Sequence, residues 1–378
     1  MKILQIHNQY LHKTGDDAVV EEERVLLSSR GNIVKQYLRS NTEANGLWGK
    51  VKTAAHIRNS KKSANEVERI LIEFKPDIVH VHNLFPMVTP SIFNVCQDFK
   101  VPVVQTLHNF RLLCVNTLFF RSGEICEDCL TKSYREGIKH GCYNNSKLQS
   151  AIMTDAIQHH FQKGTWLNKV DRFICLTEFA QEKFIQGGLP KAKLVLKPNF
   201  VRRAIDEINY EDFFLYAGKL VPEKGLDDFL ELAASLPDEK FIVAGYINDD
   251  SIFDNYSNVT YKGELNRSEL LKLMACCKAV LFLSKMYEGM PMTIIEAFAH
   301  SKAVIARKRG AMQVMISENI NGQLFDDIQS LKAIVGSFNM TKAKEFGANG
   351  YDEYVSKYSE EAAYSNLMNI YNGTIPEF

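Results

Sequence analysis

Two carboxylates in a fixed spacing are the most informative chemical pattern in this chain. Glu288 and Glu296 bracket a segment that follows an apolar stretch over 279–283 and opens a helical pattern near 292. Glu288 therefore lies on a loop at the carboxyl end of an expected strand, the edge where open α/β sheets bind ligands. Glu296, further into the helix, is placed to accept hydrogen bonds from two ribose hydroxyls. The free N–H groups at the helix start can hold a phosphate. The predicted contacts are Glu288, Gly289, Met290, Pro291, Met292, Thr293 and Glu296. The alternative is two surface carboxylates, one of them favoured by the helix dipole.

A second loop in the same half supplies cations. Gly218 and Lys219 follow an expected strand over 213–217, and Lys224 precedes a helix that begins at Gly225. Two ammonium groups at a strand-to-helix turn can neutralise a diphosphate without a divalent metal ion. No Asp-x-Asp motif follows a strand. A lysine pair in one loop is weak evidence, but two such loops at strand ends in one domain predict a metal-independent diphosphate site.

The first half carries a glycine-containing loop. Thr14, Gly15, Asp16 and Asp17 follow the first expected strand, 3–6, and open a helix over 18–29. Gly15 would let the backbone approach a phosphate or sugar, because it has no side chain. These residues are therefore assigned to the acceptor side of a site. The alternative is an ordinary turn in which an aspartate caps the helix.

Histidines end the next two expected strands. His82 lies at the carboxyl end of 77–82 and is expected to line a ligand cleft, whereas His80, two residues earlier, is expected to be buried structure. His108 follows the strand over 101–106. A lone histidine at a strand end is more often a satisfied core residue than a catalytic one.

Four of the eight cysteines are clustered. Cys114, Cys126, Cys129 and Cys142 follow the pattern C-x11-C-x2-C-x12-C in a polar segment. This spacing is typical of a structural zinc site. The alternatives are reduced surface cysteines or a regulatory disulfide. Cys96, Cys175, Cys276 and Cys277 fall in expected helices or strands and are predicted to be core residues.

The elements that position these residues alternate between strand and helix along the whole chain. Such alternation indicates an α/β protein with parallel sheets. The series restarts near 200–212, so we expect two Rossmann-like, doubly wound domains that face a central cleft. The predicted domains are 1–200, with a cysteine-rich insertion over 111–145, and 201–378.

Composition and charge limit the partners. The 378 residues have a net charge of zero, but residues 1–200 carry 27 Lys and Arg against 19 Asp and Glu, a net of +8, and residues 201–378 carry −8. No apolar run approaches the roughly 20 residues that cross a bilayer. The start is too short and too polar for a secretory signal. We therefore expect a cytoplasmic protein with no nucleic-acid partner.

One basic segment predicts a surface interaction. Residues 48–62 contain five cations and no acid, together with Trp48, Val51 and Ile57. Such a segment suits an anionic membrane leaflet, here the inner face of the plasma membrane. The alternatives are a solvated loop or a cleft rim that attracts an anionic acceptor.

Five motifs in order carry a family resemblance. They are the Glu288–Glu296 segment, the Gly218–Gly225 loop, Val243-Ala-Gly245, Gly263-Glu-Leu265 and Asn321-Gly-Gln-Leu-Phe325. Together they resemble retaining glycosyltransferases of family four (glycosyltransferase group 1), which have the GT-B fold. Two positions depart from that family. Lys219 stands where arginine is usual, and Arg309-Gly310-Ala-Met-Gln313 replaces a Gly-Gly…Glu motif.

The resemblance implies a function and a set of roles. His108, Glu288 and Lys224 would be catalytic, Gly245 and Leu265 would join the donor site, and the last helix, near 360–371, would pack back on the first domain. The implied reaction is hexosyl transfer from a UDP- or GDP-linked sugar to a glycan or polyprenyl-linked acceptor, with retention, in surface polysaccharide synthesis. No cofactor is implied for catalysis. The alternatives are a nucleotide-sugar epimerase of similar fold and a non-catalytic glycan-binding pseudo-transferase.

Overall fold

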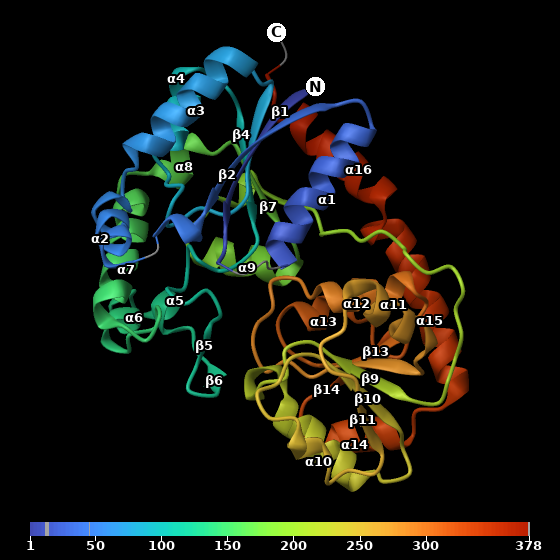
Figure 1. Cartoon of the computed structure of the whole chain (residues 1–378). Helices are drawn as coiled ribbons and strands as arrows, with labels where there is room; N and C mark the ends of the chain where they lie inside the picture. Colours follow the sequence, from blue (N-terminus) through green and yellow to red (C-terminus); the bar gives the residue numbers. More distant parts are fainter. Residues whose placement is uncertain (12–14, 45, 377–378) are drawn as a thin grey trace. The chain divides into compact units, whose positions relative to one another are not determined.

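The computed structural model describes residues 1–11, 15–44 and 46–376, which fall into two compact units (Figure 1). Unit 1 contains Met1–Phe119, Cys126–Pro198 and the chain from Tyr364 onward. Unit 2 contains Asn199–Ala363 and the short segment Phe120–Ile125. The last helix, α16 (Glu360–Asn372), therefore begins in unit 2 and ends in unit 1.

The sheet of unit 1 is parallel throughout, in the order β2-β1-β3-β4-β7-β8. Its strands β3 and β4 are fully buried, as their dense apolar sequences predict for strands covered on both faces. The strand order reverses between β1 and β3, which creates a crevice at their carboxyl ends. The strand bounds are β1 (Lys2–Gln9), β2 (Ile33–Ser40), β3 (Ile78–Val81), β4 (Val103–Leu107), β7 (Arg172–Cys175) and β8 (Leu194–Leu196).

Helices connect these strands, and local signals set their ends. The α1 helix begins at Gly15, earlier than the sequence pattern indicated. Just beyond its end lies Gly31, whose positive φ suits the end of a helix. Ser60 caps α3 by accepting a hydrogen bond from the N–H of Ser63. The helices are α1 (Gly15–Ser29), η1 (Asn41–Ala44), α2 (Gly46–His56), α3 (Lys61–Phe74), α4 (Ile92–Asp98), α7 (Lys147–Gln162), α8 (Thr165–Lys169) and α9 (Glu178–Gln186).

The cysteine-rich segment forms short elements. They are β5 (Phe120–Arg121), β6 (Glu124–Ile125), α5 (Asp128–Thr131) and α6 (Arg135–Lys139). The β5–β6 pair is antiparallel and groups with unit 2, whereas the flanking residues group with unit 1.

Unit 2 repeats the doubly wound plan in the order β11-β10-β9-β12-β13-β14, again all parallel. Its strands are β9 (Phe214–Ala217), β10 (Phe241–Ala244), β11 (Val259–Tyr261), β12 (Ala279–Phe282), β13 (Ala303–Arg307) and β14 (Gly322–Phe325). Its helices are η3 (Pro222–Lys224), α10 (Leu226–Ser235), η4 (Ser251–Phe253), α11 (Arg267–Cys276), α12 (Met292–Ala299), α13 (Ala311–Met315), α14 (Ile328–Gly336), α15 (Met340–Glu353) and η5 (Tyr354–Tyr358). A cluster of buried aromatic rings on β9, β10 and α10 fixes one face of the sheet.

Within the described residues, no helix combines the length and the apolar character that crossing a membrane requires.

Candidate active site

The two loops predicted to hold a diphosphate meet in unit 2. A cavity of about 110 Å³ is lined by Gly218, Lys219, Lys224, Ser284 and Thr293. Gly218 and Lys219 follow β9, Ser284 follows β12, and Thr293 lies in the first turn of α12. β9 and β12 are adjacent parallel strands, so their carboxyl ends bring the two loops to one place. The cavity therefore combines two ammonium groups with the start of a helix.

Glu288 orients one of these cations. Its Oε1 atom lies 2.7 Å from the Nζ atom of Lys224 and accepts a 2.6 Å hydrogen bond from the hydroxyl of Ser284. Ser284 is 1% exposed, so its hydroxyl is a buried donor that helps to hold the carboxylate of Glu288 in place. Sequence reasoning missed Ser284, which has no motif of its own.

The backbone of the cavity depends on glycine. Gly245 has a φ of 148°, and a Cβ atom there would lie 1.7 Å from the carbonyl oxygen of Gly218. The N–H of Gly218 donates to the carbonyl of Ala244 at 3.0 Å. The loops after β9 and β10 therefore approach more closely than any side chain at Gly245 would permit.

No side chain caps the start of α12. Pro291 occupies its N-cap position in an extended conformation, with no side-chain cap and no acid in the first turn. The N–H groups of an uncapped helix start attract a phosphate. Met290 is instead buried, and its sulfur accepts a 3.1 Å hydrogen bond from the N–H of Asn199. Met292 also contacts Asn199, through its sulfur at 3.6 Å from the amide nitrogen.

Glu296 has a partner that the sequence did not reveal. Arg267, at the start of α11, lies 3.2 Å from its Oε1 atom. Burial raises the pKa of Glu296, and Arg267 opposes that rise. Leu265 is half-buried just before α11 and is not among the residues that line the cavity. Gly289 lies between Glu288 and Met290 on the loop before α12.

In unit 1 the acidic start of α1 meets the ends of β1 and β3. Asp17 lies 2.9 Å from the Nε2 atom of His7, and Asp16 accepts a 2.9 Å hydrogen bond from the amide of Asn83. Gly15 is exposed, with open space where a Cβ atom would stand. Thr14 lies outside the described residues. Asp16 is also 3.9 Å from the Nδ1 atom of His108.

A buried chain of polar groups runs behind His108. Its Nε2 atom lies 2.9 Å from the Nδ1 atom of His82, and the two rings are stacked. The Nε2 atom of His82 in turn lies 3.4 Å from the carboxylate of Glu23. Glu23 also lies 3.0 Å from His80 and 3.0 Å from the ammonium group of Lys197. His82 is 1% exposed, so its ring is almost fully covered.

Burial sets the protonation states in this chain. It lowers the pKa of His108 to about 4 and holds the pKa of His82 well below its usual value. Burial alone would raise the pKa of Glu23, but Lys197 and His80 bring it well below the usual value. The result is two neutral imidazoles beside an ionised carboxylate. Sequence reasoning missed Glu23 and Lys197; a glutamate on the buried face of α1 was the available signal.

Glu23, His80 and His82 also lie close enough to share a metal ion, the one such group in the part of the chain that the structure describes. The atoms of His80 and Glu23 that could bind a metal ion already have other partners. His80 lies 2.7 Å from the hydroxyl of Tyr371 and 2.8 Å from that of Thr106, and Glu23 is paired with Lys197. We interpret the group as a buried hydrogen-bond network, not a metal site. Because Tyr371 belongs to α16, the network also fastens that helix to the sheet of unit 1.

The buried histidines predict that stability falls in acid. Burial also lowers the pKa of His160 to about 4. Below a pH of about 6.5 the unfolded chain binds protons at His108 and His160 that the folded chain does not, so stability is full above that pH and declines toward pH 4. At pH 5 each histidine should cost about 2 kcal/mol. Urea denaturation at pH 7 and pH 5 measures the difference, which should shrink in His160→Gln. The exposed His56, changed to Gln, is the control, and a stability equal at both pH values contradicts the prediction.

The cysteine-rich segment places two of its thiols together. The side chains of Cys114 and Cys129 form a hydrogen bond, which lowers the pKa of Cys114 to about 7 and raises that of Cys129. Backbone N–H groups of Asn116 and Phe119 point to the sulfur of Cys114, and those of Val115 and Gly137 to the sulfur of Cys129. Cys126 and Cys142 are half-buried.

Comparison with known proteins decides the family. A model of group 1 glycosyl transferases matches residues 200–351, and a model of glycosyltransferase family 4 matches residues 50–204. The chain belongs to the group 1 glycosyltransferases of family four. The family prediction from the sequence is therefore confirmed.

Two curated relatives resemble this chain in sequence, and one solved structure resembles it in fold. The chain is 26% identical over 183 residues to alpha-galactosylglucosyldiacylglycerol synthase of Streptococcus pneumoniae, covering 41% of this chain and 48% of that one. It is 27% identical over 222 residues to poly(ribitol-phosphate) alpha-N-acetylglucosaminyltransferase of Staphylococcus aureus, covering 54% and 44%. The matches thus span about half the length of each relative. The Anabaena protein Alr3699/HepE, crystallised with UDP, superposes with a TM-score of 0.64 at 14% identity, covering 99% of this chain and 100% of that one. This likeness confirms the expected GT-B fold.

Proposed function

We propose that this glycosyltransferase moves a hexosyl group from a UDP- or GDP-linked sugar to a glycan or lipid-linked acceptor in surface polysaccharide synthesis, with retention. The observation that carries the proposal is the unit 2 cavity, where Lys219, Lys224 and the start of α12 converge. The relatives support the acceptor class, because one is named for a diacylglycerol glycolipid and the other for a ribitol-phosphate polymer. The Anabaena structure supports the donor class, since it holds UDP.

The proposed chemistry needs no metal ion. As the glycosidic bond of the donor breaks, negative charge develops on the leaving diphosphate. Lys224, held by Glu288, and the N–H groups of α12 stabilise that charge with groups already in place. Glu296 would accept from the ribose hydroxyls. His108, neutral because it is buried, would contact the sugar with His82 and Glu23 fixing its orientation.

A panel of nucleotide sugars tests the function. One donor should raise the melting temperature, because a ligand that binds only the folded state stabilises it. The same donor should be hydrolysed slowly or transferred to an added glycan. Conversion of the donor to an isomer would indicate an epimerase, and binding without turnover would indicate a pseudo-transferase. No stabilisation by any UDP- or GDP-sugar would contradict the proposal.

We also propose that Cys114, Cys126, Cys129 and Cys142 hold a structural zinc ion. The thiol of Cys129 and the N–H groups directed at the sulfur of Cys114 lower the pKa of Cys114 and favour its thiolate, the form that binds zinc. Protein purified without added metal should contain about one zinc per chain, and Cys129→Ser should lose it. Cys277→Ser, in the core of unit 2, is the control and should keep it. Less than about a tenth of an equivalent in the wild type, with four freely titrating thiols, would exclude the site.

A further inference from the structure

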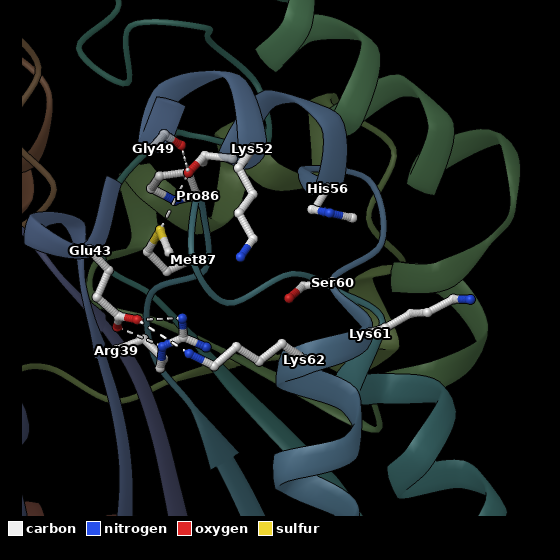
Figure 2. Close-up of a pocket in the computed structure, with 11 residues that line it drawn as sticks. Arg39, Glu43, Gly49, Lys52, His56, Ser60, Lys61, Lys62, Pro86 and Met87 are labelled. Atoms are coloured by element: carbon white, nitrogen blue, oxygen red, sulfur yellow. Dashed lines mark hydrogen bonds and ion pairs between the residues drawn. The ribbon is translucent and has the colours of Figure 1, made fainter. Parts of the chain in front are cut away.

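A second cavity, of about 370 Å³, lies in unit 1 between α2, α3 and the loop after β3 (Figure 2). Four of its lining side chains are basic and permanently charged, and one is acidic. The polar and charged lining consists of Arg39, Glu43, Lys52, Thr53, His56, Ser60, Lys61 and Lys62. The cavity is not part of the donor site, which lies in unit 2.

The cavity stands at the ligand-binding edge of the sheet. Arg39 is at the carboxyl end of β2, and Met87 is on the loop that leaves β3. Asn8, at the end of β1, accepts hydrogen bonds from the N–H groups of Met87 and Val88 at 2.8 and 3.1 Å. His108 follows β4 at the same edge. In open α/β sheets this edge binds ligands.

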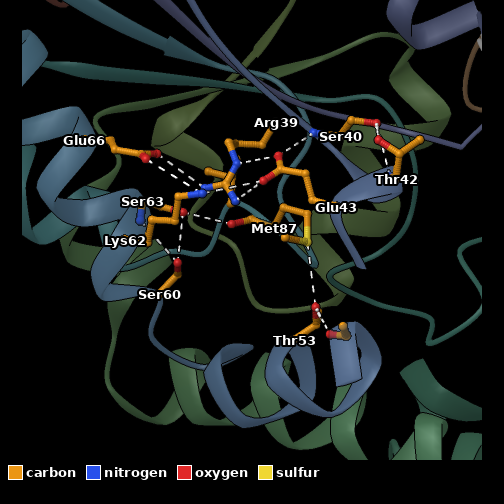
Figure 3. Close-up of polar contacts among 12 residues, drawn as sticks. Arg39, Ser40, Thr42, Glu43, Thr53, Ser60, Lys62, Ser63, Glu66 and Met87 are labelled. Atoms are coloured by element: carbon orange, nitrogen blue, oxygen red, sulfur yellow. Dashed lines mark hydrogen bonds and ion pairs between the residues drawn. The ribbon is translucent and has the colours of Figure 1, made fainter. Parts of the chain in front are cut away.

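Carboxylates in the cavity wall neutralise part of its positive charge. Arg39 makes paired hydrogen bonds of 2.6 and 2.5 Å to Glu43 and lies 3.4 Å from Glu66 (Figure 3). Lys62 lies 3.7 Å from Glu43 and 4.0 Å from Glu66. Two cations are thus balanced by two carboxylates. The network fixes the cavity wall, because Arg39 is buried.

The remaining charge is not balanced. Lys52 and Lys61 have no ion-pair partner within the described part of the chain, and His56 lies on the same rim. In Figure 2 the ammonium group of Lys52 points into the cavity, toward the side occupied by Ser60 and Lys62. The side chain of Lys61 is directed away from Lys52 in the same view, so one unbalanced positive charge enters the cavity and a second lies at its rim. Positive charge in and beside a concave site favours an anion.

The helix beside the cavity adds to this excess. The first turn of α3 contains Lys61 and Lys62 and no acid. Cations at a helix N-terminus are unfavourable, because they face the positive end of the helix dipole. The hydroxyl of Ser60 accepts from the N–H of Ser63, and its carbonyl accepts from the N–H of Ala64. A bound anion would offset the repulsion between these lysines and the helix dipole. It would also accept hydrogen bonds from the N–H groups of Lys61 and Lys62.

We propose that this cavity binds a phosphate or diphosphate group carried by the acceptor. The inference rests on the proposed function and names the chemistry of its acceptor. Lysine ammonium groups bind phosphate as point charges. A diphosphate carries enough negative charge to match Lys52 and Lys61. The volume also leaves room for atoms next to the phosphates.

Titration calorimetry of the full chain with inorganic pyrophosphate tests the site, with UDP at saturation to fill the diphosphate site of unit 2. The wild type should bind pyrophosphate, and Lys52→Gln/Lys61→Gln should bind it at least about tenfold more weakly. Lys147→Gln is the matched control, because Lys147 is also the first residue of a helix in unit 1 behind a serine cap. No binding by the wild type, or equal binding by the double variant, overturns the proposal.

A second experiment distinguishes an acceptor phosphate from the phosphates of a membrane surface. Flotation with anionic phospholipid vesicles at low and high salt tests the membrane docking expected from residues 48–62. Flotation that is lost in the double variant and is not displaced by pyrophosphate would assign the lysines to a membrane surface and overturn the acceptor site. Pyrophosphate binding without flotation supports the site. If UDP and all nucleotide sugars fail to bind, the proposed function fails, but the effect of the two lysines on pyrophosphate binding remains a separate result.

Discussion

Lys224→Ala is expected to lower the turnover number with the nucleotide sugar by about 10²-fold, a typical loss for one preorganised charged donor. Two effects add. The leaving diphosphate loses an ammonium group, and the carboxylate of Glu288, now held by Ser284 alone, is left to repel it. Because the charge develops in the transition state, kcat should fall more than the donor KM rises. Steady-state kinetics with the best donor measure both constants.

A lysine in a similar ion pair outside the cavity provides the control. Lys332 lies 2.8 Å from Glu231 on the surface of unit 2, so Lys332→Ala removes a comparable pair away from the donor. It should retain wild-type kinetics. Lys224→Arg should recover part of the activity, since it keeps the charge. Full activity of Lys224→Ala would contradict the role, as would loss of wild-type activity on brief chelation. The chelation must be brief because of the proposed structural zinc.

Gly245→Ala should destabilise unit 2 by more than about 3 kcal/mol. Losses of this size are typical of substitutions that strain the backbone or overpack the interior. A Cβ atom at Gly245 would lie 1.7 Å from the carbonyl oxygen of Gly218, at a φ of 148° that alanine avoids. The N–H of Gly245 is bonded to Gly263 at 2.8 Å, so relief by movement breaks that bond. Urea denaturation of unit 2 measures the change.

Gly336→Ala is the matched control in unit 2. Gly336 ends α14, and a Cβ atom there meets only the side chain of Leu236 at an ordinary 3.5 Å. That variant should be as stable as the wild type or more stable, because alanine loses less backbone entropy on folding than glycine. Equal stability of Gly245→Ala and the wild type would contradict the prediction. It would show that the loops after β9 and β10 can move apart without loss of stability.

The amino-acid sequence by itself determined the elements whose pattern is local. The β9 strand, Phe214–Ala217, lies within the expected 213–217, and β3 and β4 follow from dense apolar runs. The β2 strand, Ile33–Ser40, was not predicted, because it lies at the sheet edge and mixes Lys, Gln and Arg with apolar residues. The strand-end loops of the proposed donor site were predictable, since each is marked by glycine and charge next to a strand.

The tertiary structure alone decided which of these groups face one another. Lys224 meets Glu288 across 64 positions because β9 and β12 are neighbours, and that neighbourhood depends on the strand order of the whole sheet. Glu23 joins Lys197 across 174 positions, and each residue viewed alone is an ordinary charged side chain. The cation-rich cavity at Lys52 arises in the same way, from two helices and a loop that separate segments supply. Sequence patterns report periodic burial, whereas pairing between distant side chains is fixed by strand order and register.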